Sequence, residues 1–111
     1  MGKGTESAEP TDGATPGVES TESLIEVALG GEGDFMDQHD AVMSLWSVTG
    51  QEFPVAEQEL AVWGLGEIAK EAPNKGIGSL ALDRLDRIAK EDRYSRETKK
   101  LASDAIRAVL K

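Results

Sequence analysis

Apolar side chains recur along this chain at the three- and four-residue spacing of an α-helix, in five successive stretches. Glycine, proline or small polar residues separate the stretches, where they stop helices and form turns. No stretch alternates apolar and polar residues as a half-buried strand does. The pattern predicts an all-α fold of about five short helices, at about 20–29, 35–49, 54–72, 79–90 and 96–110.

The first nineteen residues lack this pattern. Apart from the initial methionine, Val18 is their only large apolar side chain, and the rest are mainly Gly, Thr, Glu, Ser, Ala and Pro. Such a segment buries too little apolar surface to offset the entropy lost on ordering. We therefore predict a disordered acidic tail at 1–19 and one helical domain at 20–111.

Residues at the predicted helix starts can accept hydrogen bonds from free backbone N–H groups. These caps are Ser20 or Thr21, Asp34 or Asp37, Ser79 and Ser95. Residues 73–78 before Ser79 are expected to form a loop. In the second helix, one face of the helical wheel collects Phe35, His39, Val42, Met43, Trp46 and Thr49, and we predict that His39 is a half-buried packing residue on this face.

The helices also recur at a period of 40 to 41 residues. A shift of 41 places Leu60 on Leu101 and Leu65 on Ile106, and a shift of 40 places Leu45 on Leu85. Three segments have a similar pattern of apolar and polar positions: LAVWGLGEIAKEAP, LALDRLDRIAKED and TKKLASDAIRAVL. A fixed period in this range is typical of helical repeats.

In these segments the chain resembles HEAT or armadillo-type repeats over about residues 20–111. It lacks the Pro-Asp-Val-Arg type of motif that usually begins the first helix of such a repeat, and Asp92, Tyr94 and Arg96 only approximate that motif. The resemblance implies an α-solenoid fragment whose stacked helix pairs offer a concave face to a protein partner, without catalysis. The alternative is a compact irregular helical bundle.

The net charge of −9 is unevenly distributed. Residues 1–74 carry 15 acidic and 2 basic side chains, net −13, whereas residues 75–111 carry 10 basic and 6 acidic ones, net +4. The negative front half argues against general nucleic-acid binding, because phosphate contacts need positive charge. It favours, as an alternative function, an acidic regulator or inhibitor of a basic nucleic-acid-binding protein.

The predicted last helix carries a basic stripe. Its members lie at or beside helical spacing on one side: Arg96, Lys99, Lys100, Arg107 and Lys111. Such a stripe can bind an anion, so weak nucleic-acid binding is a second alternative. The competing interpretation is a solvated face whose cations complement the helix C-terminus.

Groups with catalytic or metal-binding potential lack the spacing that their chemistry needs. The acids and His39 within 32–40 match no calcium loop and are interpreted as capping and packing residues. Residues 75–79 lack the order of a phosphate-binding P-loop and are interpreted as a turn. The chain has no nucleophile elbow and no cysteine. We expect no enzyme activity, metal or cofactor.

The sequence also lacks the features of membrane insertion or export. No apolar run approaches the length of a membrane span, and the N-terminus lacks the basic-then-apolar order of a signal peptide. We therefore expect a soluble cytoplasmic protein without membrane contact.

Trp63 in the third predicted helix is the clearest candidate for a contact residue. It lies opposite Leu65 on that helix and beside Val62 and Gly66. Gly64 and Gly66 cost about 1 kcal/mol each relative to alanine, which indicates close approach by a neighbouring helix or a partner. We predict a non-enzymatic protein-interaction module or adaptor whose partner contacts Val62, Trp63 and Gly66.

Overall fold

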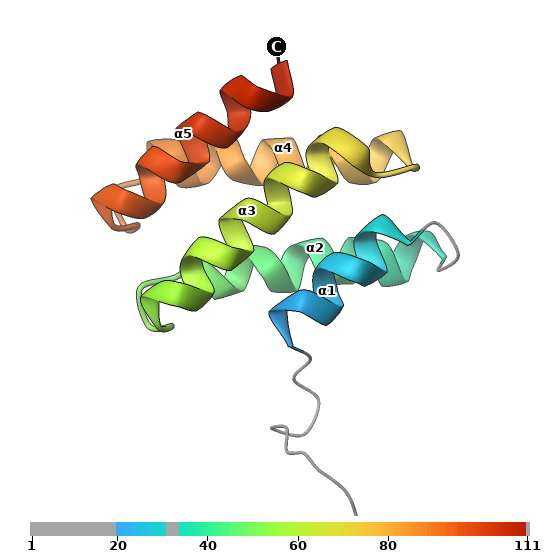
Figure 1. Cartoon of the computed structure of the whole chain (residues 1–111), viewed down its shortest axis with the longest axis horizontal. Helices are drawn as coiled ribbons and strands as arrows, with labels where there is room; N and C mark the ends of the chain where they lie inside the picture. The colour runs from blue at the N-terminus through green and yellow to red at the C-terminus, as the bar shows by residue number, and fades with distance from the viewer. Residues whose placement is uncertain (1–19, 31–33, 111) are drawn as a thin grey trace, which may run out of the picture.

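The described part of the chain folds into α-helices. A computed structural model describes residues 20–30 and 34–110, and within these ranges it contains five helices and no strand (Figure 1). The helices are α1 (Thr21–Leu29), α2 (Phe35–Val48), α3 (Val55–Glu71), α4 (Lys75–Lys90) and α5 (Arg96–Leu110). The all-α prediction with five helices is confirmed, whereas the predicted tail at 1–19 lies outside the described residues.

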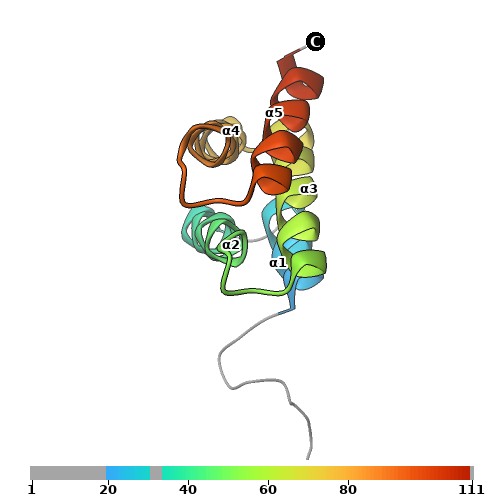
Figure 2. The same ribbon diagram turned by 90° about the vertical axis from the view of Figure 1, so that its left-hand side faces the viewer.

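The helices form two layers. In Figure 1, α1, α3 and α5 lie side by side in front of α2 and α4, and Figure 2 shows both layers from the side. Within the front layer α3 contacts both α1 and α5, and α4 contacts α2, α3 and α5. The core contains apolar side chains from all five helices, among them Leu24, Ile25, Val42, Leu45, Leu65, Ile68, Ile77, Leu85, Ile88 and Ala102. Among the described helices, none combines the length and apolar character that crossing a membrane requires.

Side-chain caps begin three helices where the sequence predicts them. The capping oxygens belong to Ser20, Asp34 and Ser95, and each accepts a hydrogen bond from the backbone N–H three residues further on, at 3.1, 2.9 and 3.1 Å. Each bond satisfies a donor that has no partner within its own helix.

The start of α4 differs from the prediction. The helix begins directly after Asn74, whose Oδ1 accepts hydrogen bonds from the N–H groups of Gly76 (2.8 Å) and Ile77 (3.3 Å). The interpretation of 75–79 as a turn, with Ser79 as the cap, is therefore wrong. Ile77 is fully buried and extends the inner face of α4, and this burial outweighs the low helix propensity of the glycines beside it.

The inner face of α2 is rotated from the one that its large apolar residues predict. The side chains that it buries are Gln38, Ala41, Val42 and Leu45. Phe35, from the predicted face, is 48% exposed, and Met43 and Trp46 are only half-buried, while His39 is half-buried as predicted. The difference arises because the positions of α1, α3 and α4 around α2 decide which side is covered, and side-chain size does not.

Two glycines let neighbouring helices approach α3 closely. A β-carbon on Gly64 would lie 2.5 Å from Cδ1 of Ile25 in α1, and one on Gly66 would lie 3.2 Å from the β-carbon of Ala105 in α5. The residues of each pair are 39 positions apart, so α1, α3 and α5 pack in a repeated register. Neighbouring helices thus account for the close approach that the glycines indicate.

Candidate functional site

The predicted partner-binding residues divide between the core and the surface. Val62 is 1% exposed, and Gly66 is buried beside α5, so neither presents a surface to a partner. Trp63, in contrast, is 56% exposed. On α3, Leu65 faces the core while Gly64 and Gly66 face α1 and α5, which leaves Trp63 on the outer side of the α1–α3–α5 layer.

Carboxylates stand on both sides of Trp63 along its helix. Glu59 and Glu67 precede and follow it by four residues, so the three side chains lie along one line on the helix surface. We call Glu59, Trp63 and Glu67 the Trp63 stripe. Glu59 is exposed, whereas the side chain of Glu67 is 30% exposed and pairs with Lys70 at 3.7 Å.

Two of the three helices in this layer, α1 and α3, are strongly acidic. Together α1 and α3 carry six carboxylates and a single basic residue, Lys70. Glu22 and Glu26 of α1 are exposed, and Leu101 of α5 adds an apolar side chain that is 36% exposed. The structure therefore combines exposed apolar surface with a negative local potential.

The predicted basic stripe lies on α5, but nearby acids pair with most of it. Its described members are Arg96, Lys99, Lys100 and Arg107, and Lys111 lies outside the described residues. Lys99 Nζ lies 3.0 Å from Asp92 Oδ1, and Asp104 pairs with Lys100 at 3.3 Å and with Arg107 at 3.5 Å. These acids lower the positive potential that phosphate contacts need.

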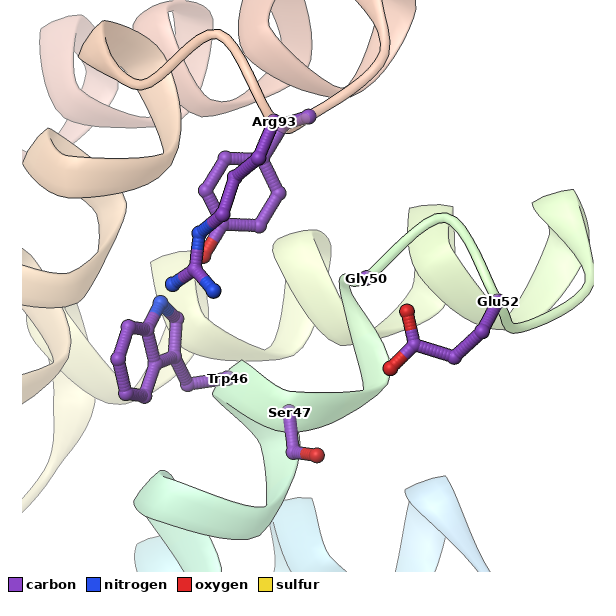
Figure 3. Close-up of a pocket in the computed structure, with 6 residues that line it drawn as sticks. Trp46, Ser47, Gly50, Glu52 and Arg93 are labelled. Atoms are coloured by element: carbon purple, nitrogen blue, oxygen red, sulfur yellow. The ribbon is translucent and has the colours of Figure 1, made fainter.

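The other tryptophan, Trp46, lines a pocket between two loops (Figure 3). The cavity measures about 290 Å³, and its walls come from the end of α2, the loop to α3 and the loop between α4 and α5. The lining residues are Trp46, Ser47, Gly50, Glu52, Arg93 and Tyr94. A hydrogen bond from Gln51 Nε2 to the carbonyl oxygen of Arg93 (2.5 Å) joins the two loops.

Two arginines stack on Trp46. The guanidinium carbon of Arg84 lies 4.8 Å from the centroid of the indole ring, and that of Arg93 lies 5.3 Å from it. A carboxylate also holds each guanidinium, because Arg84 Nη1 lies 2.7 Å from Asp83 Oδ2 and Arg93 Nε lies 2.8 Å from Glu91 Oε1. We call these five residues the Trp46 cluster. Cation–π attraction and ion pairing act together in it.

The helical wheel places Trp46 on one face with Val42 and Met43 and gives no partner for it. The two arginines follow it by 38 and 47 residues, in α4 and in the loop after α4. The signal that could have linked them is the 40-residue shift, because it predicts that α2 and α4 lie side by side.

Metal-binding geometry is absent from the described residues: no group of three or more His, Cys, Asp or Glu side chains in 20–30 and 34–110 could hold an ion. Asp34 caps α2, and half-buried His39 lies with Nδ1 3.7 Å from Asp40 Oδ1. Asp37 is exposed in the first turn of α2, and Glu32 lies outside the described ranges.

A groove also lies between α4 and α5, with a volume of about 370 Å³. Its lining residues are Ser79, Leu82, Asp83, Asp86, Ile106 and Leu110. A shift of 40 residues aligns Trp46 of α2 with Asp86 of α4. At this position α2 therefore carries an indole that contacts α4, whereas α4 carries a charged side chain. Asp86 also pairs with Lys90 at 3.0 Å.

Comparisons with models of known protein families, with curated proteins and with solved structures find no significant match to this chain.

Proposed function

We propose that this chain is a non-enzymatic protein-interaction module that presents the outer face of the α1–α3–α5 layer to a protein partner. The observation that carries the proposal is the 56% exposure of Trp63 in the middle helix of that layer. Covering the exposed half of a tryptophan contributes about 2 kcal/mol of apolar burial. Tryptophan is also enriched among the residues that dominate binding energies.

The register of the layer supports the same function. Ile25 with Gly64, and Gly66 with Ala105, pair at one separation, as expected for stacked units of a helical repeat. This agrees with the resemblance to HEAT or armadillo-type repeats, whose stacked helices form extended binding surfaces. We propose that the layer serves as such a surface.

Photo-crosslinking tests the proposal. A photoreactive aromatic amino acid, which keeps an aromatic ring at the position, replaces Trp63 in the full chain, and a second variant carries it at Arg87, which is exposed on α4 in the other layer. After irradiation in native lysate, we expect a protein adduct from position 63 that is absent from position 87. The unlabelled parent chain should suppress the adduct, and a folded Trp63→Ala chain should not. Adducts from position 87 alone would refute the proposed face.

One alternative draws support from charge. The six carboxylates of α1 and α3 favour an acidic regulator that binds a basic protein. Its affinity should fall when salt rises from about 50 to about 200 mM, because the Debye length shortens over this range. The nucleic-acid alternative, through Arg96, Lys100 and Arg107, predicts a mobility shift at low salt. The neighbouring acids Asp92 and Asp104 argue against this alternative, because they lower the positive potential of α5.

A further inference from the structure

We infer that the Trp63 stripe binds an arginine side chain in a basic segment of the protein partner. The indole of Trp63 would form the stacking surface, and Glu59 and Glu67 would form the ion pairs. The inference rests on the proposed function, because it names the chemistry of the partner at the same face.

In the Trp46 cluster this chain already stacks arginines on an indole, and Figure 3 shows one of them, Arg93, beside Trp46. There an indole carries guanidinium groups at 4.8 and 5.3 Å from its centroid, and a neighbouring carboxylate holds each guanidinium at 2.7 or 2.8 Å. Stacking and ion pairing reinforce one another because the carboxylate contacts the edge of the guanidinium and leaves its face free for the ring. Asp83 and Glu91 are sequence neighbours of the two arginines and not of the indole. The cluster therefore shows that an indole of this protein accepts a guanidinium group whose charge a carboxylate pairs.

The Trp63 stripe supplies an exposed indole and carries its carboxylates on the same helix as that indole. Side chains four residues apart on a helix stand about 6 Å from each other at their β-carbons, so Glu59 and Glu67 can reach a group placed on Trp63. Within residues 20–30 and 34–110, no arginine or lysine stacks on this indole, and Glu59 forms no ion pair. Glu67 pairs with Lys70 at 3.7 Å and, as a carboxylate, accepts further hydrogen bonds.

Charge complementarity selects a basic occupant. The net charge of the side chains of α1 and α3 is −5, since six carboxylates stand against one lysine, whereas α5 carries four basic and two acidic side chains. The α1–α3 part of the layer, which holds Glu59, Trp63 and Glu67, therefore attracts a basic segment and repels an acidic one. An apolar segment would cover Trp63 but would also desolvate the flanking carboxylates without pairing them. Arginine suits the site better than lysine, because its planar guanidinium stacks on the ring and pairs with a carboxylate at the same time.

NMR of the two indole N–H groups tests this inference with the full chain. The Trp63→Phe variant assigns the two signals, and Trp46, which already carries arginines, serves as the internal reference. The probes are short peptides of alternating glycine with arginine, lysine, citrulline, glutamate or leucine. We expect the arginine peptide to shift the Trp63 signal and not that of Trp46. The citrulline peptide, which has the same shape without the charge, should bind at least about fivefold more weakly.

Paired variants test the carboxylates. The double variant Glu59→Gln, Glu67→Gln should bind the arginine peptide about fivefold more weakly than the parent chain. The matched control, Asp40→Asn with Asp86→Asn, makes the same change in net charge on the other layer. The control should lose less than about twofold, because screened charges at a distance act weakly.

Three results would overturn the inference: equal binding of the citrulline and arginine peptides, equal losses in the two double variants, or tighter binding of the leucine or glutamate peptide at Trp63. The crosslinking experiment separates this failure from failure of the proposed function. An adduct from position 63 to an acidic or apolar partner segment would support the proposed docking face and refute arginine recognition. Absence of both the adduct and the indole shift would remove both.

Discussion

The side chain of Ile25 in α1 occupies the space directly over Gly64 in α3, where a β-carbon on residue 64 would lie 2.5 Å from Cδ1 of the isoleucine. Ile25 is only 5% exposed and is held in the core beside Leu24 and Ala28. The contact joins the first two helices of the layer that carries Trp63. The position of α1 therefore depends on the absence of a side chain at Gly64.

Gly64→Ala is expected to lower the free energy of unfolding by about 1–2 kcal/mol, because overpacking outweighs the gain in helix propensity. Urea denaturation followed by circular dichroism measures the change. In an Ile25→Ala background, which removes the obstructing atoms, the same substitution should cost nothing or stabilise. An equal loss in both backgrounds would show that Ile25 is not the cause.

Gly66→Ala is expected to change the free energy of unfolding by less than about 1 kcal/mol, because the helix-propensity gain offsets a mild contact. The new β-carbon would stand 3.2 Å from that of Ala105, on a helix at the edge of its layer. A shift of α5 by a few tenths of an ångström relieves this contact. If Gly66→Ala destabilised as much as Gly64→Ala in the same urea titration, α5 would be held as rigidly as α1.

Asn74→Ala is expected to lower the free energy of unfolding by about 1 kcal/mol, the usual value of an N-cap. It removes the oxygen that accepts from the N–H groups of Gly76 and Ile77. Ser79→Ala is the matched control: it lies inside the helix on an exposed surface and should be neutral within about 0.5 kcal/mol. Thermal denaturation measures both variants. A lower thermal midpoint for Ser79→Ala than for Asn74→Ala would show that Ser79, and not Asn74, caps α4.

Thr98→Val is expected to cost about 1–3 kcal/mol, because it leaves a buried acceptor without its donor. Thr98 Oγ1 donates to Gln58 Oε1 at 3.1 Å across α3 and α5, and the two residues are 2% and 4% exposed. Substituting both, as Thr98→Val with Gln58→Leu, should recover part of the loss in chemical denaturation. Additive losses from the two single variants would rule out coupling through this hydrogen bond.

The sequence predicts the exposure of some residues of the candidate site correctly and that of others wrongly. The helical wheel places Trp63 opposite Leu65, and Trp63 is indeed exposed. The same wheel groups Val62 and Gly66 with it, yet both are buried, because α3 has neighbours on two sides. A wheel records directions around one helix axis, and it contains no information on which directions other helices cover.

The sequence by itself determines the helices of this protein and most of their boundaries, because spacing, capping residues and helix breakers act within a few positions of one another. Ser20, Asp34 and Ser95 are caps for that local reason. Only the tertiary structure decides the rotation of α2, the inclusion of Ile77 in α4 and the arginines stacked on Trp46. Each of these depends on burial or pairing with residues far away in the chain, whose free energy exceeds the local preferences of the segment.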